Sequence, residues 1–183
     1  MVGSIVTLLA FVYLTMVLMR KLIPLNPTTW FLWTLLDAFI AYKMFGSKHE
    51  SRWIMVGFTT GACIVGCFAL AQVVQGKSTW TWSNKETLTL ICFVIAFVIS
   101  LVTVSEKMAI NICTTAMLVA GIPVLIDAWH QPKGQDPVFW GTCTVGWIIT
   151  LGGTPKGFTK RYMPIGGLIL NGLIAALAIK ASM

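Results

Sequence analysis

Seven runs of apolar residues, separated by short polar or turn-rich stretches, constrain the fold of this chain more than any other feature. A helix needs about 20 residues to cross the roughly 30 Å hydrocarbon core of a bilayer. Hydrophobic residues make up 57% of the sequence and charged residues only 10%, too few for a water-facing surface. The pattern predicts an all-α membrane protein with seven transmembrane helices, at residues 2–19, 28–45, 53–74, 86–104, 108–129, 137–151 and 162–179.

The basic residues are spread along the chain. The thirteen basic residues outnumber the six acidic ones, which gives a net charge of +7, but they form no dense run. Basic side chains at helix ends anchor a membrane protein to anionic headgroups, whereas nucleic-acid binding requires a clustered basic patch. We therefore expect the lipid bilayer to be a partner and nucleic acid not to be one.

The same residues bear on orientation. The loops on the N-terminal face carry seven of them and the loops on the opposite face carry six, so the totals do not decide. Arg20 and Lys21 follow the first apolar run directly, and the first helix often dominates insertion. This favours an N-terminus outside and a C-terminus inside.

Motifs for catalysis and metal binding are missing from the sequence. It has no nucleophile elbow, zinc-protease pair, phosphate-binding glycine loop or CxxC motif, and its two histidines lie in loops. The five cysteines fall within apolar runs and are interpreted as packing residues, although Cys63 and Cys67, four residues apart, leave a redox or metal role open. We expect no enzyme activity, no cofactor and no metal site.

An internal duplication is the most informative pattern. Residues 26–30 and 136–140 each begin with Asn or Asp, continue with proline, and place tryptophan three residues beyond that proline, at an offset of 110 positions. Residues 52–57 and 161–166 each begin with arginine and an aromatic residue and end with glycine, at an offset of 109. Two matches in nearly the same register indicate that helices one to three recur as helices five to seven.

This duplication divides the chain into a first three-helix repeat (1–75), a segment containing a loop and a linker helix (76–107), and a second three-helix repeat (108–183). Because the linker is a single span, both repeats enter the membrane in the same direction. The expected architecture is therefore 3+1+3, with Trp30 and Trp140 at equivalent positions.

A 3+1+3 layout resembles the SWEET sugar transporters and the wider PQ-loop group, above all small prokaryotic SWEET-like proteins. The likeness in motif covers residues 27–33 and 120–129. It implies a carrier in a prokaryotic cytoplasmic membrane that passes a sugar, an amino acid or a vitamin-like metabolite, by facilitated or proton-linked transport. The Pro-Gln pair of the PQ-loop group is absent, and Pro123 is the only candidate hinge in a comparable place.

Asp37 is the foremost candidate for binding a solute. It lies about ten residues into the second helix, near mid-bilayer, where a carboxylate costs roughly 2.5–3.5 kcal/mol on insertion scales. Trp30 and Trp33 precede it on the same helix face and suit a sugar ring or a cation. The alternative is an interfacial tryptophan belt with a carboxyl that bonds to a neighbouring helix.

Further candidates lie on three other helices. On the sixth helix, Trp147 shares a face with Trp140. Asn171 on the seventh helix and Thr60, with its neighbour Thr59, on the third could line a central cavity. Threonines in membrane helices commonly bond to their own backbone instead.

A second function class remains open. With no Pro-Gln motifs and few central polar residues, the chain also fits an accessory or structural subunit of a larger membrane complex. A homo-oligomer is compatible with either function.

Overall fold

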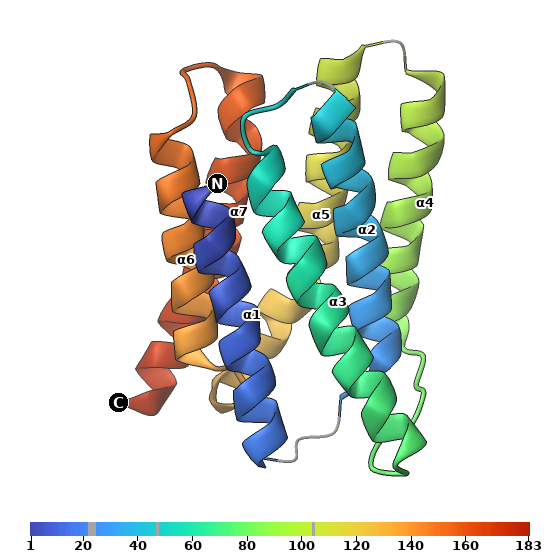
Figure 1. Cartoon of the computed structure of the whole chain (residues 1–183), viewed down its shortest axis with the longest axis vertical. Coiled ribbons are helices and arrows are strands. Elements are labelled where there is room, and N and C mark those ends of the chain that lie inside the picture. The colour runs from blue at the N-terminus through green and yellow to red at the C-terminus, as the bar shows by residue number, and fades with distance from the viewer. Residues whose placement is uncertain (22–24, 47, 104) are drawn as a thin grey trace.

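The computed structural model describes residues 1–21, 25–46, 48–103 and 105–183, and these are all-helical (Figure 1). The described residues form seven α-helices and one short 3-10 helix, with the N-terminus and C-terminus near opposite ends of the bundle (Figure 1). The prediction of an all-α protein is confirmed. The elements are α1 (Val2–Lys21), α2 (Pro27–Gly46), α3 (Arg52–Val74), α4 (Asn84–Val102), α5 (Glu106–His130), η1 (Pro132–Gly134), α6 (Pro137–Gly152) and α7 (Phe158–Ser182).

The helix boundaries lie close to the predicted ones. The largest difference is at α7, which begins at Phe158 because the charged residues Lys160 and Arg161 join its first turn instead of the preceding loop. The predicted end of the fourth helix, Val104, lies outside the described residues. Asp136 caps α6, and its carboxylate accepts a hydrogen bond from the Phe139 N–H at 2.8 Å.

Five of the described helices are long and apolar enough to span a membrane: α1, α3, α4, α5 and α7. By length and composition, the chain is therefore an integral membrane protein. The other two long helices do not meet the same criteria. Helix α2 carries Asp37 and Lys43 within its apolar sequence, and α6 has only 16 residues.

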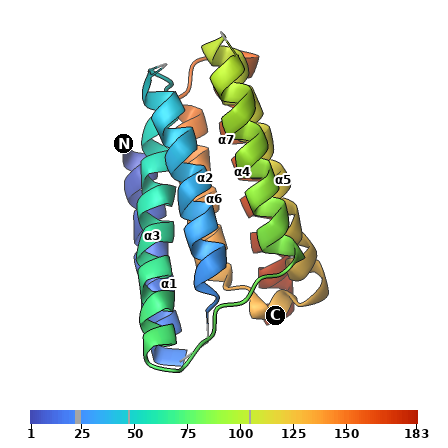
Figure 2. The ribbon, with the colours of Figure 1, turned by 90° about the vertical axis from the view of Figure 1, so that its right-hand side faces the viewer.

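Helix α3 packs between α1 and α2, and α7 packs between α5 and α6. Among the described residues, the backbone of α1 does not approach that of α2, and the backbone of α5 does not approach that of α6. Helix α1 also packs on α6, and α2 on α5. Helix α4 contacts α2 and α5, so it lies on the opposite side of the bundle from α1 and α3 (Figure 2).

Small residues allow α1 and α6 to cross at close range. A Cβ added at Gly3 would lie 2.8 Å from the Gly146 carbonyl oxygen, and one added at Gly146 would lie 2.5 Å from Thr7 Oγ1. No side chain larger than hydrogen fits at either position without a shift of the helices. This crossing lies at the end of the bundle where α1 begins.

Candidate functional site

A cavity of about 230 Å³ lies at the centre of the bundle, among six of the seven helices. Seven of its lining residues are aromatic and only a few are polar. The lining consists of Phe11, Thr29, Trp30, Trp33, Asp37, Phe58, Ala62, Met117, Gly121, Val124, Gln135, Phe139, Trp140, Trp147, Leu170, Asn171 and Ile174.

Asp37 is the one charged residue in this lining. Its side chain is buried, with 3% of its surface exposed. Among the described residues, no hydrogen bond donor and no cation pairs with its carboxyl group. A buried acid without a partner is costly in a protein interior, so Asp37 is placed to interact with whatever occupies the cavity.

Trp147 and Asn171 add two further unmatched polar groups. The Trp147 indole is buried and stacks on the Phe58 ring at 5.3 Å between centroids, and its Nε1–H has no acceptor. The Asn171 side chain donates from Nδ2 to the Gly167 carbonyl oxygen at 2.8 Å, which leaves its Oδ1 without a donor. Among the described residues, the Trp147 Nε1–H and the Asn171 Oδ1 are therefore buried without a partner, in the same lining as the Asp37 carboxyl.

Gly167 makes room for the Trp147 ring. A Cβ at this position would lie 2.6 Å from Cζ2 of the indole. The glycine lets α7 approach α6 closely enough for the ring to form one wall of the cavity.

Three of the lining residues, Thr29, Gln135 and Trp140, already take part in hydrogen bonds. Thr29 donates a hydrogen bond through its hydroxyl to Glu86 at the start of α4. The Trp140 Nε1–H donates to Gln135 Oε1 at 2.9 Å. These bonds fix one margin of the cavity and leave its aromatic faces free.

Five of the six predicted binding residues line this cavity: Trp30, Trp33, Asp37, Trp147 and Asn171. The sixth, Thr60, is exposed on the outside of α3 and does not line it. Its neighbour Thr59 is half-buried and is also absent from the lining. Pro123, the predicted hinge, lies inside α5, which continues without a break to His130.

Sequence reasoning missed Phe11, Phe58 and Gln135. The two phenylalanines carried no signal because an apolar residue on an apolar helix can face lipid or the interior equally well. The equivalence with Trp30 was the signal that could have assigned Trp140 to the lining.

The cavity adjoins a second and larger one toward the end of the bundle that holds the C-terminus. This second cavity measures about 490 Å³ and shares Trp30, Gln135, Phe139 and Trp140 with the central cavity. Its other walls include Leu18 near the end of α1. The central cavity is therefore nearest to solvent at this end.

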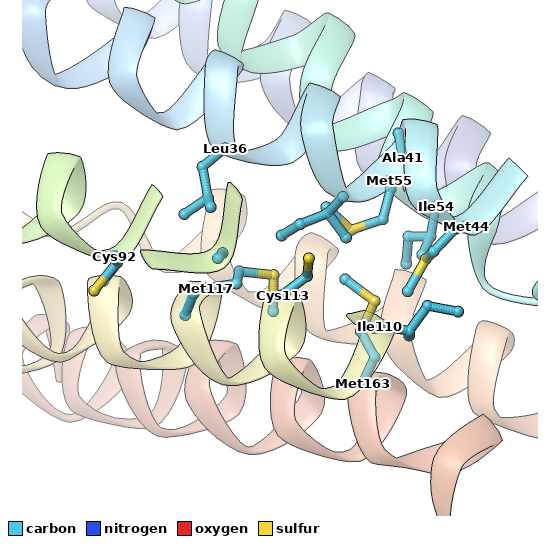
Figure 3. Close-up of a cluster of buried hydrophobic side chains, with 14 of the residues drawn as sticks. Leu36, Ala41, Met44, Ile54, Met55, Cys92, Ile110, Cys113, Met117 and Met163 are labelled. Atoms are coloured by element: carbon cyan, nitrogen blue, oxygen red, sulfur yellow. The ribbon is translucent and has the colours of Figure 1, made fainter. Parts of the chain in front are cut away.

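Toward the opposite end of the bundle, apolar side chains close the central cavity. Met44, Met55, Cys113, Met117 and Met163 belong to one buried cluster, in which residues of α2, α3, α5 and α7 face one another (Figure 3). Methionine side chains adapt to changes in packing more easily than branched ones do. This sulfur-rich cluster separates the central cavity from the loops at that end.

At the same end of the bundle, beyond the methionine cluster, the loop between α2 and α3 contacts the start of α7. Lys160 Nζ lies 2.8 Å from Glu50 Oε1, and His49 Nε2 lies 3.4 Å from the Thr159 carbonyl oxygen. Burial lowers the pKa of His49, although the Thr159 carbonyl acts in the opposite direction. The hydrogen bond from Lys160 lowers the pKa of Glu50.

In the described part of the chain, no group of three or more His, Cys, Asp or Glu side chains comes close enough to hold a metal ion.

Comparison with known proteins gives no relative. No family model, no curated protein and no solved structure matches the chain. A functional interpretation therefore depends on the geometry of the cavity and its two ends.

Proposed function

We propose that this protein is a membrane carrier that moves a small polar solute by alternating access to the central cavity. In this proposal all seven helices cross the bilayer as two parallel three-helix repeats, 1–75 and 108–183, joined by the segment 76–107. The single observation that carries the proposal is the cavity itself, which is central, aromatic and supplied with unmatched polar groups.

Residues at the repeat offset recur as pairs in the cavity lining, which supports the duplication. Adding 110 to positions 11, 29, 30 and 37 gives 121, 139, 140 and 147, and adding 109 to position 62 gives 171. All ten of these positions line the cavity. The pairs are Phe11 with Gly121, Thr29 with Phe139, Trp30 with Trp140, Asp37 with Trp147, and Ala62 with Asn171.

Helix contacts have the same twofold pattern. The contacts of α3 with α1 and α2 correspond to those of α7 with α5 and α6, and the contact of α1 with α6 corresponds to that of α5 with α2. At the end with the methionine cluster, Glu50 pairs with Lys160, which is 110 positions further along. Equivalent loops therefore meet near the axis that would relate the two repeats.

The two ends of the cavity differ in a way that alternating access requires. One end is sealed by the methionine cluster, the Gly3–Gly146 crossing and the loop contacts, while the other adjoins the larger cavity. Rocking of one repeat against the other would open the first end and close the second. Pro123, whose ring removes one helical hydrogen bond in α5, offers a place where the second repeat can bend.

Uptake into proteoliposomes tests this function. We expect the purified chain to accelerate uptake of at least one solute from a panel of sugars, amino acids and vitamin-like metabolites, with and without a pH gradient. Asp37→Asn should reduce that uptake about tenfold or more, because the lost interaction lies in a site shielded from water. Asp127→Asn is the matched control, since this acid pairs with Lys85 outside the cavity.

Two results would contradict the proposal. Wild-type uptake in Asp37→Asn would remove Asp37 from the mechanism. A chain that transports nothing and purifies with a stoichiometric companion protein would instead be an accessory subunit of a larger membrane complex.

A further inference from the structure

We propose that the solute is a small monovalent organic cation and that Asp37 is its counter-ion. This inference rests on the carrier function proposed above and specifies its substrate class.

The charge of the cavity selects the charge of the solute. Among the described residues that line the cavity, Asp37 is the only ionisable acid or base, and none is a lysine, arginine or histidine that could neutralise it. An anion would meet a like charge and no compensating cation. An ammonium or similar group would instead supply the partner that the buried carboxyl lacks.

The walls favour the same class of solute. Trp30 and Trp33 lie on α2 with Asp37, and Trp147 faces the cavity from α6. The face of an indole ring attracts a cation, by about 0.5–1 kcal/mol at exposed sites and about 2 kcal/mol or more where water is excluded. Aromatic walls around a single carboxyl group are the arrangement that recognises alkylated ammonium groups.

A sugar fits these walls less well. The Thr29 hydroxyl, Gln135 Oε1 and the Trp140 N–H are already engaged in hydrogen bonds, so three polar lining groups are occupied. Besides Asp37, the buried lining atoms without a partner among the described residues are Asn171 Oδ1 and the Trp147 Nε1–H. Because most of the wall is aromatic or aliphatic, a sugar with hydroxyl groups on every side of its ring would lose water at several of them without gaining a partner, and each such loss is unfavourable.

Size sets the remaining limit. A cavity of about 230 Å³ has the volume of about eight water molecules at roughly 30 Å³ each. A solute of the size of choline fits within it. One polar group on such a solute could bond to Asn171 or Trp147 while its cationic centre lies beside Asp37.

A pair of isosteric probes tests the inference on the full-length protein in detergent. Choline and its uncharged carbon analogue 3,3-dimethylbutan-1-ol differ in charge but hardly in shape. We expect choline to quench tryptophan fluorescence and to raise the melting temperature at concentrations about tenfold or more below those of the analogue. In Asp37→Asn this preference should disappear, whereas Asp127→Asn should retain it.

The outcomes separate this inference from the carrier function. Equal affinity for choline and its analogue, or an unchanged preference in Asp37→Asn, overturns the cation inference. Binding and uptake of a neutral sugar without binding of choline overturns it as well, and leaves the carrier function standing. If no solute of any class is bound or transported, both proposals fail. The comparison of the two probes on the wild-type chain needs no variant, so it is decisive even if Asp37→Asn fails to fold.

Discussion

Asp37 and Trp147 stand at equivalent positions of the two proposed repeats but carry opposite hydrogen-bonding capacities. Asp37 supplies a carboxyl group, and Trp147 supplies an indole N–H without an acceptor. Two carboxylates facing one another would repel, because like charges in a shared buried site disfavour ionisation. With a carboxyl group on one side and an N–H donor on the other, the two sides of the cavity differ chemically. A solute with two different ends can therefore bind in one orientation.

His49 gives the sealed end a dependence on pH. Its Nδ1 accepts a hydrogen bond from the Ser51 N–H at 3.1 Å, so Nε2 carries the proton that points to the Thr159 carbonyl. Because burial lowers its pKa below the ordinary value of 6.5, the folded state prefers neutral imidazole. Its contribution to stability is present above about pH 6.5 and is lost as the pH falls through the lower, folded-state pKa.

We therefore compare melting temperatures in detergent at pH 7.5 and pH 5.5, which lie roughly on either side of the free histidine pKa. Between these two values we expect the melting temperature of the wild-type protein to fall more than that of His49→Gln. Glu50 should not contribute to this difference in melting temperature, because its lowered pKa keeps it ionised throughout this pH range. His130→Gln is the control, since His130 is exposed at the end of α5. Identical pH dependence in wild type and His49→Gln would contradict the assigned role of the imidazole.

Among the elements, α2 and α6 provide seven of the cavity-lining residues and are the two long helices that fall short of the criteria for a membrane span. The two facts have one cause in the case of α2. Asp37 lines the cavity, and the same charged side chain lowers the hydropathy of α2. Helices that face lipid over most of their surface, such as α4, carry no such requirement.

The crossing of α1 and α6 is a place where the sealed end can be held shut. With Thr7→Cys and Gly146→Cys, in a chain whose five native cysteines are changed to alanine, the Cβ of residue 146 would lie 2.5 Å from the position that Thr7 Oγ1 now occupies. The two cysteines are therefore close enough to bond, and the disulfide replaces the contact that excludes an unbonded side chain at Gly146. Oxidation should reduce transport about tenfold or more, because the two repeats could no longer separate there, and reduction should restore it. Solute binding should survive, since the other end stays open.

The variant that carries Thr7→Cys alone serves as a control, and its transport should not respond to oxidation. Full transport by the crosslinked protein would show that this end need not open. The sealed end would then have no part in the transport cycle.

At the scale of the whole molecule, apolar runs predicted the helices well because crossing a bilayer leaves few alternatives to a helix. The site was predicted in part. Polar and aromatic residues such as Asp37 and Trp147 are conspicuous in an apolar sequence, whereas Phe11 is not. Thr60 was predicted to line the site but does not. A threonine on a membrane helix can face either the interior or the outside, and the packing of α3 against α1 and α2 sets the rotation that leaves Thr60 exposed.

The whole-molecule prediction concerns the number of crossings and their direction. An odd number of spans must place the two termini on opposite sides of the membrane, and the Arg20–Lys21 pair after the first apolar run favours an outside N-terminus. Single cysteines at the exposed positions Val2, Lys156, Thr79 and Ser182, in a chain without native cysteines, would report the side of each segment.

We expect a membrane-impermeant maleimide to label the cysteines at positions 2 and 156 in intact cells. Those at 79 and 182 should be labelled only after the membrane is permeabilised. The reverse result would keep the seven crossings and invert the orientation. Labelling of positions 2 and 182 from the same side would require an even number of spans. In that case either α2 or α6 would fail to cross, and the two parallel repeats, which need both helices to enter the membrane in the same direction, could not exist.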